Sequence, residues 1–183
     1  MPADPLPIDT ASLRLRHLVV EEAALLMELN GEPSTRRWLS SHVYPDTEAA
    51  IARVRYLVSC YSSPGDPRLG PYVLAVEHLA SGTLLGHVGF SPLRSEVEIS
   101  YAIAEGSRRH GYGTEALLHS CRWAARRFDL PRILAITDSA NAPSRRTLER
   151  AAFVHDEDTV MHFQGSPQTV SRYVWRSPAV PTR

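Results

Sequence analysis

The segment from Glu98 to Leu117 restricts the fold more than any other part of the chain. An alternating stretch typical of a strand leads into a loop with three glycines, and an amphipathic stretch typical of a helix follows. Glycines let a backbone approach a ligand closely, and a helix start offers unpaired N–H groups and the positive end of the helix dipole. Arg108 and Arg109 add positive charge. The segment therefore predicts a cradle for a phosphate or pyrophosphate group within an α/β domain.

Two common phosphate-binding motifs do not match this loop. The dinucleotide pattern G-x-G-x-x-G fails because Gly111 and Gly113 are followed by no third glycine at the required spacing. A P-loop needs a lysine, and all 20 cationic residues of this chain are arginines. The absence of lysine also excludes Schiff-base and pyridoxal-phosphate chemistry. A Gly-rich turn that merely begins a helix stays open as the simpler alternative.

The remaining sequence supplies the strands and helices around this segment. Ala80-Ser81-Gly82 is typical of a hairpin turn, and Asp46 is a candidate N-cap for the helix that follows it. Antiparallel strands followed by strand–helix–strand–helix predict an α/β sheet of mixed direction with helices on its faces. The expected strands are 13–16, 72–77, 83–90, 97–103, 133–137, 160–163 and 170–175, and the expected helices are 21–29, 47–59, 113–128 and 142–151.

The length and charge of the chain limit the number of domains and the kinds of partner that we expect. A chain of 183 residues suits one domain, which we place at 11–176 between a flexible tail at 1–10 and a second tail at 177–183. A net charge of zero argues against a general nucleic-acid partner. No apolar run suits a membrane span and no signal-peptide layout is present, so we expect a cytoplasmic protein. Cys60 and Cys121 have no metal-ligand spacing, and we expect reduced, half-buried thiols.

Three motifs in order resemble those of one known family. Arg108-x-x-Gly111-x-Gly113 resembles the R/Q-x-x-G-x-G/A signature of the GNAT superfamily of acyl-CoA-dependent N-acetyltransferases, within the stretch EISYAIAEGSRRHGYGTEAL. LRLRHLVVEEAALLMEL resembles the start of the RimJ/RimL branch, the ribosomal-protein acetyltransferases. ITDSANAPSRRTLERAAF resembles the second signature of that branch, although Ala152 replaces the glycine before the aromatic residue. The resemblance spans residues 10 to 176.

The resemblance implies both a fold and an activity. The fold would be a GNAT-like α/β (α+β) structure: a mixed, mostly antiparallel sheet of about six to seven strands, flanked by about four helices and splayed at the central strand. The activity would be transfer of an acetyl group from acetyl-CoA, without a metal, to a protein N-terminus or a small-molecule amine. A non-catalytic acyl-CoA-binding sensor and an α/β domain for another phosphate ligand remain alternatives. The two C-terminal strands are candidates for pairing in a homodimer.

The resemblance also assigns the co-substrate site. It implies that main-chain groups of Tyr101 and Ile103 bind the pantetheine arm and that the loop holds the pyrophosphate. Tyr101 and Ile103 can also be ordinary core strand residues, and the two roles are compatible because the cofactor contacts are made by the main chain. The implied cofactor-binding residues are Tyr101, Ile103, Arg108, Arg109, His110, Gly111, Tyr112, Gly113, Thr114 and Asn141.

Three residues are candidates for the chemistry. By resemblance, Asn141 would orient the cofactor amide or a water, and Ser144 would approach the thiol sulfur; both residue types also commonly cap helices. Glu98 occupies a strand position where relatives carry a glutamate and is the candidate general base, provided that burial or a water relay assists it. A solvated glutamate is the alternative for Glu98 and the favoured interpretation for Glu96. Proximity to the thioester is an alternative to any dedicated base.

Fewer residues are candidates for contacts with the acceptor substrate. By resemblance, Trp38, His42 and Tyr44 lie where the family forms its acceptor pocket, and they are the candidate substrate contacts. Trp38 suits the core equally well. His155-Asp156-Glu157-Asp158 lacks metal-ligand spacing on one face, so we expect a solvated turn there and no metal site.

Overall fold

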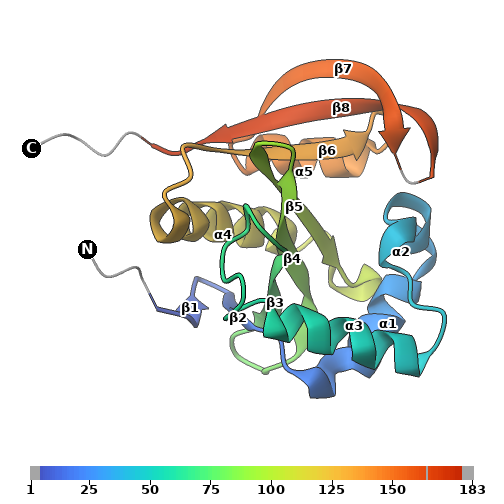
Figure 1. Cartoon of the computed structure of the whole chain (residues 1–183), viewed down its shortest axis with the longest axis vertical. Helices are drawn as coiled ribbons and strands as arrows, with labels where there is room; N and C mark the ends of the chain where they lie inside the picture. Colours follow the sequence, from blue (N-terminus) through green and yellow to red (C-terminus); the bar gives the residue numbers. More distant parts are fainter. Residues whose placement is uncertain (1–4, 164, 179–183) are drawn as a thin grey trace, which may run out of the picture.

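The computed structural model describes residues 5–163 and 165–178. Within them, eight strands form one sheet in the order β1-β2-β3-β4-β5-β6-β8-β7, and five α-helices flank it (Figure 1). The strands are β1 (Ile8–Asp9), β2 (Leu13–His17), β3 (Tyr72–His78), β4 (Leu84–Leu93), β5 (Glu96–Ile103), β6 (Arg132–Asp138), β7 (Val154–Phe163) and β8 (Ser166–Arg176). The helices are α1 (Ala23–Gly31), α2 (Pro33–Trp38), α3 (Thr47–Ser59), α4 (Tyr112–Phe128) and α5 (Ala142–Arg150). The mixed, mostly antiparallel α/β class is confirmed.

Helices cover both faces of the sheet because strand residues alternate between two apolar clusters. In β3, Leu74 and Val76 pack in the larger cluster with residues of α4 and α5. Val73 and Ala75, which alternate with them along the strand, pack in a smaller cluster with residues of α1 and α3. Figure 1 shows α1 and α3 together, away from α4. A side chain on any central strand therefore faces either the α4–α5 face or the α1–α3 face.

Local sequence signals explain where the helices begin. Asp46 accepts a hydrogen bond from the backbone N–H of Ala49 at 2.8 Å, and α3 runs over the residues that we predicted. Gly111 precedes α4 in the left-handed region, with φ +87°. That conformation favours glycine, and it turns the chain from the loop into the helix.

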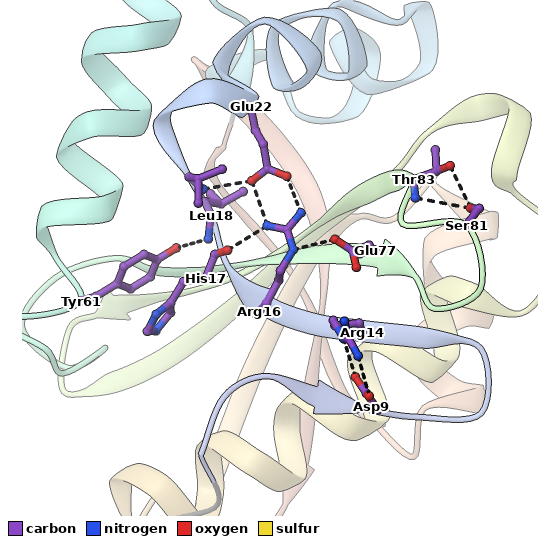
Figure 2. A network of polar contacts seen from close by, with 11 residues as sticks. Asp9, Arg14, Arg16, His17, Leu18, Glu22, Tyr61, Glu77, Ser81 and Thr83 are labelled. Carbon is purple, nitrogen blue, oxygen red and sulfur yellow. Dashed lines mark hydrogen bonds and ion pairs between the residues drawn. The ribbon is translucent and has the colours of Figure 1, made fainter.

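A polar network fixes the entry into α1 (Figure 2). Arg16 of β2 donates to Glu77 of β3 at 2.7 Å and to Glu22, which ends the short 3₁₀ turn η1 (Val20–Glu22), at 2.6 Å. Glu22 also accepts the backbone N–H of Val19 at 3.0 Å. The network joins two strands to the start of α1 and so positions the helices of the α1–α3 face.

Strand β5 separates from β6 over most of its length. Among the described residues, β5 pairs with β4 from Glu96 to Ile103, whereas it pairs with β6 in parallel at a single position, Glu98 with Leu134. Ala104 donates to Leu85 in the β4 ladder. Because hydrogen-bonded pairs alternate along an antiparallel ladder, the main-chain groups of Ile103 point away from β4, into the gap beside β6. The expected splay at the central strand is confirmed.

Several elements differ from the sequence-based expectations. Helix α2 was not predicted, because its six residues show no apolar period. Strand β7 begins at Val154, six residues before the expected start, and contains the four residues expected in a solvated turn. Strand β8 lies between β6 and β7, so β7 is the edge strand of the pair.

The two ends of the chain are described in part. Ile8 and Asp9, which we placed in a flexible tail, form strand β1 against β2. Ser177 donates to the carbonyl of Pro131 at 3.0 Å. Residues 1–4 and 179–183 of the expected tails lie outside the described residues. No helix in the described part of the chain is long and apolar enough to cross a membrane.

Candidate functional site

A cleft of about 550 Å³ opens where β5 and β6 separate, bounded by α2, α4 and α5. All of the predicted cofactor-binding residues line it except His110. The His110 ring stacks on the Tyr112 ring with centroids 5.5 Å apart and lies exposed outside the cleft. The predicted co-substrate residues therefore gather in one cavity, at the end of the sheet gap.

The start of α4 forms a cradle at one end of this cleft. The backbone N–H groups of residues 111–114 donate to no acceptor among the described residues. A Cβ at Gly111 would meet nothing within 4 Å, so the backbone is open to a ligand there. Arg109 also has positive φ, +67°. Unpaired N–H groups at the positive end of a helix dipole suit a phosphate or pyrophosphate group.

Arg108 connects this loop to α2, in addition to lining the cleft. Its Nε donates to the carbonyl of Ile103 at 2.7 Å, and its other guanidinium nitrogens contact Ser34, Thr35 and Glu32. Ser34 and Thr35 belong to α2. The side chain that we predicted to bind the cofactor therefore holds α2 over the end of β5.

Two hydroxyl groups meet inside the cleft between β5 and α5. The Tyr101 hydroxyl lies 3.2 Å from Ser144 Oγ. Burial raises the pKa of Tyr101, and the hydrogen bond to Ser144 offsets part of that rise. Both hydroxyls therefore keep their protons at neutral pH. The pair can donate hydrogen bonds to a group that develops negative charge in the cleft.

Asn141 performs the structural task that we considered as its alternative. Its side-chain oxygen accepts the backbone N–H of Ser144 at 3.2 Å, which makes Asn141 the N-cap of α5. Asn141 is also buried and lines the cleft. Capping is thus confirmed, and a direct role toward the co-substrate stays a prediction.

Two variants separate these roles of Asn141. Asn141→Ala removes the cap and should lower the free energy of unfolding by about 1 kcal/mol. Asn141→Asp keeps an oxygen that accepts the Ser144 N–H, so its stability should stay close to that of the wild type. Chemical denaturation measures stability, and initial rates measure turnover. If Asn141→Asp is stable and fully active, the carboxamide NH₂ has no role in the reaction.

Glu98 and Glu96 have opposite environments, although they lie two residues apart on β5. Burial raises the pKa of Glu98. The hydrogen bond from Arg132 lowers the pKa of Glu96, which remains a paired surface carboxylate. Glu98 alternates with Ile99 and shares its face with Ser100, whose Oγ lies on the α1–α3 side next to Gly89. Of the two, Glu98 has the raised pKa that suits a general base, although it does not line the cleft.

The three predicted acceptor contacts fall in two places. Trp38 is half-buried at the large cleft, where Arg37 lies 4.4 Å from its ring centroid. His42 and Tyr44 line a second, smaller pocket on the α1–α3 face. Ser100 lines both cavities, so they adjoin at β5.

Sequence reasoning missed several residues of the site. Arg146 and Arg150 lie one turn apart on α5 and both line the large cleft. Their i, i+4 spacing next to the Asn141 motif was a usable signal. His87 and Arg53 line the smaller pocket. His87 lies in a mostly apolar strand, which was also a signal. Nothing local distinguishes Arg53 from Arg55, the other arginine of α3.

The acidic segment after α5 is an exposed part of β7. His155 contacts Asp158 at 2.9 Å, and Arg172 of β8 pairs with Asp156 and Glu157. The expected turn was wrong, because these residues form a strand that pairs with β8. Their exposure to solvent agrees with the expectation. Within the described residues, no group of three or more His, Cys, Asp or Glu is placed to hold a metal ion.

Comparisons with known proteins agree with this geometry. An acetyltransferase (GNAT) domain model matches residues 12–154. No curated protein matches the chain.

Similar solved structures include a GNAT-family acetyltransferase from Bacillus anthracis, 16% identical, with a TM-score of 0.79 over 93% of this chain and 98% of that one. RimL, a ribosomal L7/L12 alpha-N-protein acetyltransferase solved with coenzyme A, is 16% identical with a TM-score of 0.77 over 92% and 96%. The microcin C7 self-immunity acetyltransferase MccE, solved with acetyl-CoA and AMP, is 13% identical with a TM-score of 0.79 over 95% and 98%. Since the domain model covers most of the chain and the fold agrees, the chain belongs to the GNAT family of acetyltransferases.

Proposed function

We propose that the chain transfers the acetyl group of acetyl-CoA to a primary amine, on a protein N-terminus or a small molecule, by direct transfer in a ternary complex. The observation that carries this proposal is the gap between β5 and β6, which leads to the unpaired N–H groups before α4. Main-chain groups beside the gap can pair with the extended amide-bearing arm of a coenzyme, while the loop holds its pyrophosphate. Solved neighbours with coenzyme A or acetyl-CoA support the choice of ligand.

Bound acetyl-CoA supplies a thioester carbonyl that a neutral amine can attack. In the net reaction a C–N bond forms, the C–S bond breaks, the amine loses a proton and the thiolate gains one. In this proposal Glu98, whose pKa is raised by burial, accepts the amine proton, directly or through water. Ser144, next to the Tyr101 hydroxyl, donates a hydrogen bond to the developing thiolate.

The cleft offers further support for cofactor binding. Arg146 and Arg150 give it positive charge beyond the loop, which suits a ligand with several phosphates. Asn141 adds a buried carboxamide to the lining of the cleft.

The two cysteines bear on the proposed location. Cys60 and Cys121 are free and buried, more deeply than we expected, which fits a reducing, cytoplasmic location.

Turnover tests the proposal directly. Purified protein is mixed with acetyl-CoA and a panel of amines that includes peptides with free N-termini, and thiol release is followed together with the mass of each amine. We expect an acetylated amine and stoichiometric thiol. Selective binding of acetyl-CoA without transfer to any amine would instead indicate the non-catalytic sensor.

Ser144→Ala tests the thiolate donor. We expect kcat to fall by about 100-fold, because the donor acts mainly as charge develops on sulfur. The dissociation constant of acetyl-CoA, measured by calorimetry, should change little. An unchanged kcat would leave Ser144 with no part in the reaction beyond its place in α5.

A further inference from the structure

The smaller pocket lies on the α1–α3 face of β4 and β5 and has a volume of about 80 Å³. Gly89 lines the pocket together with Val73 and Ser100. A Cβ at Gly89 would lie 3.2 Å from Cγ2 of Val73 and 3.3 Å from Oγ of Ser100. Ser100 also lines the large cleft. A group held in this pocket therefore lies next to the β5–β6 gap.

The pocket is positively charged at its rim. Arg53 of α3 lines it and is exposed, so a ligand can reach the guanidinium. Arg53 lies 5.2 Å from the Tyr56 ring centroid, and no described carboxylate forms an ion pair with it. None of the described residues that line the pocket is acidic. An arginine fork with no carboxylate partner in the described part of the chain matches the geometry of a carboxylate ligand.

The two imidazoles of the pocket add hydrogen-bonding groups without adding charge. His42 and His87 stack with ring centroids 5.6 Å apart. Burial lowers the pKa of His87 to about 3, and burial together with the Arg53 charge lowers the pKa of His42. Asn30 Oδ1 lies 3.1 Å from Nε2 of His87 and holds that ring in place. At neutral pH the pocket thus combines one cation with neutral polar groups.

The face beyond the pocket carries the opposite charge. Ser91, which lines the pocket, pairs with Glu98 across β4 and β5, so both residues lie on the same face. This face therefore carries a cation and polar groups at the pocket and a carboxylate next to Ser91 of its lining. These groups are complementary to a molecule that carries both a carboxylate and an amine.

We propose that the smaller pocket binds the carboxylate of the acceptor and that the acceptor is a free amino acid. The inference rests on the acetyl transfer proposed above and narrows its acceptor. A cavity needs only about 10–15 Å³ of volume to hold a water molecule, so a pocket of about 80 Å³ has room for a carboxylate. A protein N-terminus has an amide at the corresponding position and cannot form the charged pair with Arg53.

Matched pairs of acceptors test this directly. Each of the proteinogenic L-amino acids is compared with its own carboxamide as acceptor for acetyl-CoA. The amine of a carboxamide loses its proton more readily, so without carboxylate recognition the carboxamide would be the better acceptor. We expect at least one free amino acid to exceed its carboxamide in kcat/KM by about 10- to 100-fold, as suits a charged hydrogen-bonded pair.

Two arginine variants of α3 locate the effect. Arg53→Gln should remove the preference for the free acid, while Arg55→Gln, an exposed neighbour outside both cavities, should keep it. Binding is read separately from the His42 imidazole resonances, with coenzyme A bound and the preferred amino acid titrated. We expect a saturating shift in the wild type and its loss in Arg53→Gln.

The outcomes distinguish this inference from the proposed function. Two results would overturn the proposed carboxylate site and leave the proposed acetyl transfer intact. The first is that peptides or carboxamides are acetylated as efficiently as free amino acids. The second is that the Arg53→Gln variant keeps the preference for the free acid. The same holds if peptides or carboxamides are acetylated and no free amino acid is acetylated. If acetyl-CoA does not bind, both proposals fail.

Discussion

Gly111→Asp is expected to lower the affinity for acetyl-CoA by at least about 100-fold. The Cβ of residue 111 points into space where nothing lies within 4 Å, so the new carboxylate enters the cradle without displacing protein atoms. Two like charges about 4 Å apart near a protein surface repel by about 4 kcal/mol. The carboxylate would also accept the N–H groups that otherwise face the phosphates. Calorimetric titration of the variant measures the loss.

Gly82→Asp is the matched control. Gly82 has φ +69°, close to the backbone conformation of Gly111, and its Cβ would also meet nothing within 4 Å. It lies in the turn between β3 and β4, outside the cleft. Both variants introduce the same charge and similar backbone strain, so they should lose similar stability. An equal loss of acetyl-CoA affinity in both, or no loss in Gly111→Asp, would contradict the assignment of the loop.

Glu98→Gln is expected to lower kcat by about 100- to 10,000-fold while acetyl-CoA affinity stays unchanged. A general base works in its ionised form, so the wild-type rate should fall as pH falls through the pKa of Glu98. Burial raises that pKa above its ordinary value, and the inflection should be raised accordingly. The variant should lose this limb of the pH–rate profile. Steady-state kinetics across pH checks both expectations.

The stability of the same variant gives an independent readout. Because the pKa of Glu98 is raised by burial, the folded state holds the proton more tightly than the unfolded state, and stability is lost as pH rises through that pKa. Glu98→Gln removes this loss, so at pH 8 it should be at least as stable as the wild type. Glu96→Gln, which removes a carboxylate paired with Arg132, should leave kcat unchanged. Full activity of Glu98→Gln would show that proximity to the thioester suffices without this base.

The parts of the fold that were predictable have strong local signals. Helix α3 follows from its apolar period and from Asp46 as N-cap, and its observed bounds match the expected ones. The β3–β4 hairpin follows from the glycine of its turn, which has positive φ. Helix α2 and the first half of β7 had no such signal. Arg108 contacts hold α2 in place, and pairing with β8 extends β7, so tertiary contacts decide both.

The candidate site also has parts that could be predicted from the sequence and parts that could not. The loop and the start of α4 were predictable because three glycines, two arginines and a helix start are contiguous in the sequence. The smaller pocket was not predictable from the sequence. It depends on the register that pairs Gly89 of β4 with Ser100 of β5 and on the packing that brings Arg53 of α3 to them. The hydrogen bonds of the Arg108 guanidinium depend equally on the placement of α2. Local chemistry was readable from the sequence, and contacts across the sheet were not.

Calorimetric titration of the wild-type protein with acetyl-CoA, with ATP and NAD as controls, tests the central claim most directly. We expect saturable binding of acetyl-CoA with one molecule per chain and much weaker binding of ATP and NAD, because the gap beside β5 accepts an extended arm that neither control has. A folded sample that binds no acetyl-CoA, or that binds ATP or NAD equally well, would contradict the assignment of the cleft and of the reaction.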